Sequence, residues 1–228
     1  MIITRDIASH NSIRAVILDL DGTLVDTAGE IALALNETLA ELGLRPMSLE
    51  AATALIGRGV RSLVERALEE VGGATDLERA VERFEEHYVR TVATRAELFP
   101  GVREGLHVLR AAGFALGVVT NKPRLFTEKL LHHLEVDGLF DTVVAGDDGH
   151  RRKPSGDMLA AAAKSIGAHI DETLMVGDSD NDVAAARDAG CRVWCVPYGY
   201  NEGRPADSLR CDRMVATVLE VARLLAKG

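Results

Sequence analysis

The 228-residue sequence contains little cysteine, and this shortage argues against a fold held together by disulfide bonds. Its three cysteines are Cys191, Cys195 and Cys211, an odd number in a chain of this length. Cys191 and Cys195 flank an extended run, so about four strand steps place them roughly 13 Å apart. That distance is too long for a disulfide bond. We therefore expect free, buried thiols.

The sequence also lacks an excess of basic residues and any long apolar stretch. It has 26 lysines and arginines against 35 acidic residues, for a formal net charge of −9, whereas nucleic-acid binders carry a basic footprint. No apolar run reaches the roughly 20 residues of a membrane span, and the N-terminus has no secretory apolar core. We expect no nucleic-acid partner, no membrane association and a cytoplasmic location. An anionic substrate would then need a local group of positive charges.

Short apolar runs alternate with helical patterns over most of the chain. The predicted strands are residues 15–20, 115–119, 142–145, 174–176 and 192–196. The predicted helices between the later strands are residues 102–111, 125–134, 158–166 and 183–189. Strands that alternate with helices indicate βαβ units and a parallel sheet. With right-handed crossovers, the fold class is α/β with a doubly wound parallel sheet.

One long segment interrupts this alternation. Residues 28–96 show apolar positions at helical spacing in three stretches, 31–42, 60–71 and 77–91, with glycines that end the first two, and no convincing strand. We predict a helical domain over residues 27–96, inserted into a core formed by residues 1–26 and 97–228. The insert is expected to cover the carboxyl ends of the strands as a lid, where it would exclude water and contact a substrate. The alternative is that its helices pack beside the sheet.

Polar clusters follow four of the predicted strands. The run Asp-Leu-Asp-Gly-Thr at 19–23 follows the first strand, and Thr-Asn-Lys-Pro at 120–123 follows the second. The third strand precedes Gly-Asp-Asp at 146–148 and Arg-Arg-Lys-Pro at 151–154, and the fourth precedes Gly-Asp-Ser-Asp-Asn-Asp at 177–182. Because ligands of open α/β sheets bind beyond the carboxyl ends of the strands, we expect these clusters to meet in one site.

The charges of these clusters point to phosphoryl chemistry. Four aspartates would lie close together with a single lysine, and such crowding is costly without a cation; they are Asp19, Asp21, Asp178 and Asp182, with Lys153. Mg²⁺ with oxygen ligands would offset this charge beside a phosphate. Phosphoryl transfer needs mainly positioning and charge stabilisation. One carboxylate of the first pair could then act as a nucleophile and the other as a general acid and base.

The four clusters, in this order, resemble the motifs of the haloacid dehalogenase-like (HAD) phosphohydrolase superfamily. The resemblance covers nearly the whole chain and implies a Rossmann-like core with a helical cap inserted after the first motif. It also implies a division of roles. Asp19 would be the nucleophile and a Mg²⁺ ligand. Asp21 would be the general acid and base, and its backbone carbonyl would bind the metal. Asp178 would be the remaining protein ligand of the metal.

The resemblance assigns further residues around the phosphoryl group. Thr120 and Lys153 would bind the phosphoryl oxygens, and Asn121 would contact either the phosphoryl group or the rest of the substrate. Asp182 would orient Lys153 or a metal-bound water, with Thr23 in the same surroundings. On a loop between two cap helices, Arg58 could pair with a substrate carboxylate or could be a solvated surface residue.

Two features distinguish between the groups of enzymes within this superfamily. Dehalogenases of this superfamily lack the second aspartate of the first motif, so Asp21 favours phosphoester chemistry. Phosphonatases use a lysine of the cap, and residues 28–96 contain no lysine. The chain is most similar to the phosphoglycolate phosphatase group, on the strength of residues 19–27, 146–148 and 196–201.

The expected partner is therefore a small phosphorylated metabolite, with the chain acting as a monomer or homodimer. Three alternatives remain. One is a phosphatase for a sugar phosphate or pyrophosphate. Another is a phosphomutase like β-phosphoglucomutase. The third is a protein without catalysis, either a phospho-aspartate regulator or a silent partner protein.

Overall fold

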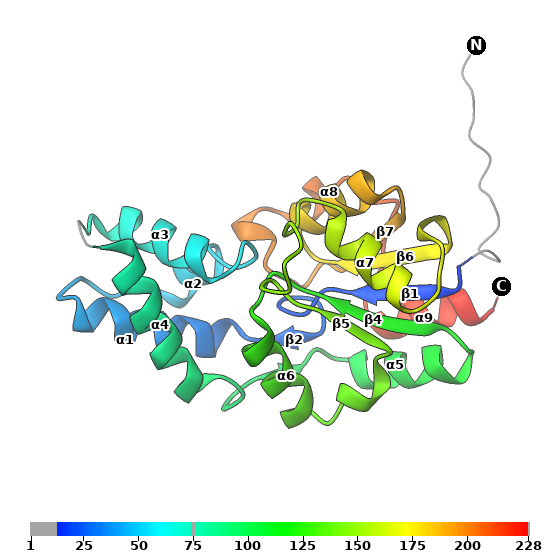
Figure 1. The fold of residues 1–228 in the computed structure, drawn as a ribbon, viewed down its shortest axis with the longest axis horizontal. Coiled ribbons are helices and arrows are strands. Elements are labelled where there is room, and N and C mark those ends of the chain that lie inside the picture. Colours follow the sequence, from blue (N-terminus) through cyan, green and yellow to red (C-terminus); the bar gives the residue numbers. More distant parts are fainter. Residues whose placement is uncertain (1–12, 74–75, 228) are drawn as a thin grey trace, which may run out of the picture.

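A computed structural model describes residues 13–73 and 76–227 of the chain. In these residues the main sheet has six parallel strands in the order β5-β4-β1-β6-β7-β8 (Figure 1). Their bounds are Ala15–Leu18 (β1), Ala115–Val119 (β4), Thr142–Val144 (β5), Thr173–Gly177 (β6), Arg192–Cys195 (β7) and Arg213–Met214 (β8). All five predicted strands are present, and the predicted doubly wound α/β class is confirmed. The short edge strand β8 was not predicted.

Helices cover both faces of this sheet and bury its alternating apolar side chains. On one face, Val16 and Leu18 belong to the same apolar cluster as residues of α5 (Val102–Ala111), α6 (Arg124–His133) and α9 (Val218–Ala226). On the other face, Ile17 packs with residues of α7 (Asp157–Ser165) and α8 (Asp180–Ala189). Successive residues of a strand point to opposite faces, so a continuous apolar strand needs this cover on both sides.

The topology places the site at the middle of the sheet. The strands β4 and β5 lie on one side of β1, whereas β6, β7 and β8 lie on the other. Successive strands are thus added first on one side of β1 and then on the other. The crevice at such a switch point binds ligands in open α/β sheets. The loops that follow β1, β4 and β6 are therefore neighbours, although far apart in the sequence.

The segment between β2 (Val25–Asp26) and β3 (Glu97–Leu98) is helical, and these two strands pair antiparallel at its base. In its described part it contains four helices, α1 (Ala28–Glu41), α2 (Leu49–Thr53), α3 (Val60–Val71) and α4 (Leu77–Thr91). Three of them were expected. The helix α2 was missed because five residues are too few to show an apolar stripe. The domain boundaries at 26/27 and 96/97 stay a prediction and fall beside β2 and β3.

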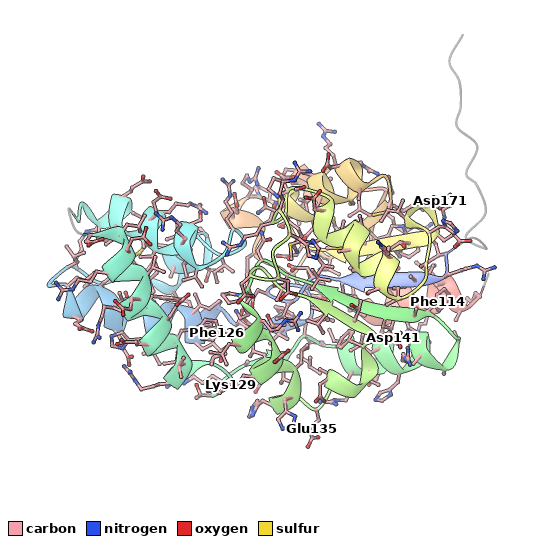
Figure 2. The ribbon with its side chains drawn as sticks, viewed as in Figure 1. Phe114, Phe126, Lys129, Glu135, Asp141 and Asp171 are labelled. Carbon is pink, nitrogen blue, oxygen red and sulfur yellow. The ribbon has the colours of Figure 1, made fainter. Side chains whose placement is uncertain are left out.

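The helical lobe lies beyond the carboxyl ends of the strands, at the left of Figure 1. On α6, Phe126 and Lys129 lie on the side of the lobe (Figure 2). The Phe126 ring packs edge-on against Tyr88 of α4 with 4.7 Å between centroids, and Lys129 Nζ donates a hydrogen bond of 2.7 Å to the Val89 carbonyl. The lobe therefore has the position of the expected lid and is not packed along a face of the sheet.

Two absences in the described residues bear on the sequence predictions. The three cysteines are free thiols, and Cys191 and Cys195 are buried, as expected. None of the described helices combines the length and apolar character that crossing a membrane requires.

Candidate active site

The loop after β1 carries the first two acidic residues of the site. The strand ends at Leu18, two residues earlier than predicted, so Asp19 and Asp21 both lie in the loop. Gly22 follows with a φ of +88°, and a Cβ atom on it would collide with the carboxylate of Asp178. Glycine alone combines this conformation with so close an approach. The Asp-Gly-Thr turn therefore brings the loop of β1 against the loop of β6.

Lys153 connects three parts of the site. Its ammonium group is buried and donates hydrogen bonds to Asp19 Oδ1 at 2.6 Å, to Asp182 Oδ1 at 2.7 Å and to the Val119 carbonyl at 3.0 Å. Burial alone would lower the pKa of Lys153, but the charges of Asp182 and Asp19 outweigh it and raise that pKa above its usual value. Lys153 is therefore a permanent cation next to Asp19.

Asp182 occupies the first turn of α8 and holds Lys153 in place. Its Oδ2 accepts hydrogen bonds from the Ser179 hydroxyl at 2.7 Å and from the backbone N–H groups of Ser179 and Asp178. A carboxylate at a helix N-terminus is stabilised by these otherwise unpaired N–H groups. Its other oxygen is free to accept from Lys153, which is the contact that its predicted orienting role requires.

Asp178 is buried behind the loop of β1. Its Oδ1 accepts a hydrogen bond of 3.0 Å from the Thr23 hydroxyl, and its Oδ2 accepts one of 2.7 Å from the backbone N–H of Tyr200. Burial, reinforced by the charge of Asp182, raises the pKa of Asp178 to about 7 despite these hydrogen bonds. Thr23 therefore contacts a predicted metal ligand, and its supporting role stays a prediction.

The carboxylates of Asp19, Asp178 and Asp182 each offer an oxygen, and the three oxygens lie within 4.8 Å of one another. Burial raises the pKa of Asp19 well above its usual value, Lys153 opposes this shift, and the charges of Asp182 and Asp178 add to it. Three buried carboxylates beside one lysine are a donor set that a hard divalent cation would stabilise in the ionised form. The residues present therefore fit a metal ion. The Asp21 carboxylate is not part of this group.

Asp21 instead pairs with Lys122, a residue that the sequence analysis matched to a motif but gave no role. Lys122 Nζ lies 2.8 Å and 2.9 Å from the two carboxylate oxygens of Asp21, and the Thr27 hydroxyl donates to Asp21 Oδ1 at 2.7 Å. The Lys122 side chain is only 4% exposed. The one feature of the sequence that could have indicated Lys122 as a site residue was its position directly after Thr120 and Asn121 in the loop of β4.

A pocket that is partly open to solvent lies between the two lobes at this point. The core contributes Asp19, Asp21 and residues 120–123 to its wall. The helical lobe contributes mainly apolar groups, which are Ile31, Ile56, Gly57, Gly59, Val60, Leu63, Phe84 and Tyr88. The structure thus brings the predicted residues Asp19, Asp21, Thr120 and Asn121 to one cavity that the lobe covers in part.

Thr120 and Asn121 are both buried, but they differ in what their side chains contact. The Thr120 hydroxyl oxygen accepts a hydrogen bond of 3.2 Å from the backbone N–H of Lys122. The Asn121 amide donates to the carbonyls of Gly57 and Lys153, each at 2.9 Å, and accepts from the Lys153 N–H at 3.0 Å. Asn121 therefore ties the lid loop to the Lys153 loop through backbone groups, and its predicted substrate contact stays a prediction.

Arg58 is not among the residues that line this pocket. Its guanidinium is half exposed and pairs with the carboxylate of Glu202, with 2.8 Å between Nη2 and Oε2. Glu202 follows the Gly-Tyr-Asn run at 199–201, so the ion pair joins the lid loop to the loop beyond β7. The structure places Arg58 at the contact between the lobes and does not bring it to the cavity where a substrate carboxylate was expected to meet it.

Comparison with known proteins agrees with this geometry. Residues 16–196 match the sequence model of the haloacid dehalogenase-like hydrolases. A phosphoglycolate phosphatase of Nitrosospira multiformis is 45% identical over 220 residues, covering 95% of this chain and 97% of the relative. One of Thiobacillus denitrificans is 40% identical over 223 residues, covering 95% and 97%. A solved structure described as a predicted phosphoglycolate phosphatase from Haemophilus somnus has a TM-score of 0.89 and 29% identity, covering 93% of this chain and 98% of that one.

Proposed function

Because this chain belongs to the haloacid dehalogenase-like hydrolases, we propose that it is a Mg²⁺-dependent phosphatase that converts 2-phosphoglycolate to glycolate and phosphate. The observation that carries the proposal is the meeting of Asp19, Lys153 and Asp178 at one buried edge of the sheet, beside a cavity that the lid covers in part. The two relatives named phosphoglycolate phosphatase, at 45% and 40% identity, support the substrate.

The metal would be held by Asp19, by Asp178 and by the backbone carbonyl of Asp21. When bound, Mg²⁺ supplies positive charge that offsets the carboxylates and a phosphoryl oxygen. Lys153 and the Thr120 hydroxyl bind the other phosphoryl oxygens, whose charge they stabilise. Asp182 holds Lys153 in position by accepting a hydrogen bond from its ammonium group. These contacts orient the phosphorus atom toward Asp19.

The reaction then proceeds in two steps on the protein's own carboxylates. A carboxylate oxygen of Asp19 attacks phosphorus, the bond from phosphorus to the ester oxygen breaks, and an aspartyl-phosphate forms. Asp21 donates its proton to the leaving alkoxide of glycolate. Asp21 then accepts a proton from a water molecule, which attacks phosphorus and releases phosphate from Asp19. The apolar lid limits the access of other water to the intermediate.

A panel of phosphoesters assayed with and without Mg²⁺ tests this proposal. We expect steady phosphate release from 2-phosphoglycolate in Mg²⁺, slower release from a sugar phosphate or pyrophosphate, and none after chelation. A sustained release without a bisphosphate activator would exclude a phosphomutase. If no phosphoester is turned over by the folded protein, the phosphatase proposal fails and the regulatory or silent alternative gains support. The cytoplasmic location, the small-metabolite partner and the monomer or homodimer stay predictions.

Metal binding should depend on pH through Asp178. Its pKa is about 7 in the folded protein, above the roughly 3.9 of an exposed aspartate, so the folded state holds an extra proton between these values. Stability without metal therefore falls as pH rises through this window. Because a proton competes with the metal, we expect MgCl₂ to raise the melting temperature more at pH 8 than at pH 6. Thermal melts of wild type and Asp178→Asn measure this difference.

The Asp178→Asn variant has no titrating carboxylate at this position and serves as the comparison. Its response to Mg²⁺ should be small at both pH values. An equal or larger Mg²⁺ response of the wild type at pH 6 would contradict the assignment of Asp178 as a metal ligand.

A further inference from the structure

Lys122 is the only lysine, arginine or histidine among the described residues that line the cavity. The lid presents apolar side chains there, and Arg58 of the lid loop is paired with Glu202 outside the cavity. Lys153 points to the phosphoryl end of the site, toward Asp19 and Asp182. A second negative charge on a substrate would therefore find one positively charged partner inside the cavity, the ammonium of Lys122.

The surroundings of Lys122 suit an ammonium group that changes partner. Its Nζ contacts both carboxylate oxygens of Asp21 and lies 4.9 Å from the centre of the Tyr88 ring. An aromatic face stabilises a cation without fixing it by a directed hydrogen bond. The Tyr88 hydroxyl donates to Glu30 Oε1 at 3.3 Å. Glu30 is itself buried, and although burial raises its pKa, the charge of Lys122 acts in the opposite direction. Lys122 thus keeps favourable neighbours when it leaves Asp21.

The chemistry of the reaction places a substrate carboxylate close to Lys122. Asp21 must approach the ester oxygen to protonate it, and Lys122 is in direct contact with Asp21. In 2-phosphoglycolate the carboxylate carbon is two bonds beyond that oxygen. The carboxylate and the Asp21 side chain therefore compete for the same ammonium group, and a charge-assisted hydrogen bond is available to whichever is nearer.

We propose that Lys122 is the specificity residue, selecting phosphomonoesters with a carboxylate on the carbon next to the ester oxygen by moving from Asp21 to that carboxylate. The proposal rests on the proposed phosphatase function and names its recognition element. A substrate without the carboxylate leaves Lys122 on Asp21, so that the acid and base group stays engaged in its ion pair. A substrate with the carboxylate takes over the ammonium of Lys122, so that one buried charge pair replaces another and Asp21 is freed. Binding and catalysis then favour the same substrates.

Binding to an Asp19→Asn protein tests this proposal without requiring turnover. The affinities of 2-phosphoglycolate and of 2-hydroxyethyl phosphate, an analogue of similar size with a hydroxymethyl group in place of the carboxylate, are measured by calorimetry in Mg²⁺ with and without Lys122→Met. Because Lys122→Met removes a hydrogen bond between charged groups, the affinity for 2-phosphoglycolate should fall by about 10- to 100-fold. The affinity for 2-hydroxyethyl phosphate should change by less than about threefold, because its hydroxyl group makes no charge pair with Lys122. Lys164→Met, on the exposed surface of α7, is the matched control.

The outcomes separate this inference from the proposed function. Equal weakening of both ligands, or no discrimination between them by the protein with Lys122 intact, overturns the role of Lys122 in selection. Binding of 2-phosphoglycolate that depends on Lys122, in a protein whose wild type does not hydrolyse it, supports the inference and refutes the proposed reaction. If Lys122→Met does not fold, Lys122→Gln carries the same comparison, and Lys122→Arg should retain the preference for the carboxylate.

Discussion

Replacing Asp19 with asparagine is expected to lower turnover by about 10⁴-fold or more, the scale at which removal of a nucleophile acts in enzymes with a covalent intermediate. The amide is a poor nucleophile and cannot form the acyl-phosphate bond. The change is nearly isosteric, and Lys153 keeps its hydrogen bonds to Asp182 and to the Val119 carbonyl. We therefore expect the variant to fold and to retain part of its affinity for substrate, as measured by phosphate release and by calorimetry.

A matched control is Asp171→Asn. Asp171 is exposed and lies two residues before β6, at the opposite end of the strands from the site (Figure 2). This variant should have the activity of the wild type. Near-normal turnover by Asp19→Asn would refute the assignment of Asp19 as the nucleophile, whatever the result with the control.

The second large effect is expected for Asp21→Asn, which should slow the hydrolysis of 2-phosphoglycolate by about 10²- to 10⁴-fold, the usual range for a general acid and base. An alkoxide is a poor leaving group and needs the proton that Asp21 gives. A nitrophenolate leaves without such help, so para-nitrophenyl phosphate should still phosphorylate Asp19. Water would then attack slowly, because the base is missing.

Stopped-flow absorbance can separate these two steps. With Asp21→Asn and para-nitrophenyl phosphate we expect a burst of one nitrophenolate per enzyme, followed by a slow steady rate. The hydrogen bond from the Thr27 hydroxyl to Asp21 Oδ1 can persist with asparagine, so the loop should keep its place. Steady-state rates equal to those of the wild type with both substrates would contradict the acid and base role.

The acidic edge of the sheet was predictable from sequence, because the direction of parallel strands determines where their loops meet. Parallel strands end at one edge, so the acids after β1 and β6 and the lysine after β5 had to converge once the alternation of strands and helices was recognised. Asp19, Asp178 and Lys153 lie together as this reasoning required. The alternation also indicated the inserted lobe, since 28–96 showed no strand pattern. The short elements α2 and β8 were not predictable, because a periodic pattern needs more residues than they contain.

The contacts between the lobes were not predictable from the sequence. Arg58 was expected either at the substrate or in solvent, and it pairs with Glu202, 144 residues away in the sequence. Asn121 was expected at the phosphoryl group or the substrate, and its amide bonds to backbone carbonyls of two loops. These partners depend on the angle at which the lobe meets the sheet. No local pattern encodes that angle.

The sequence by itself determined the class of the fold and the acidic edge of its sheet, because hydrophobic periodicity and strand direction act over short stretches of chain. Only the tertiary structure decided what faces the cavity beyond that edge. Lys122 and Asp21 are 101 residues apart, and their meeting depends on how the loop of β4 packs beneath Tyr88 of the lid. A long side chain in a loop has many possible partners, and the packing of the surrounding elements selects one of them.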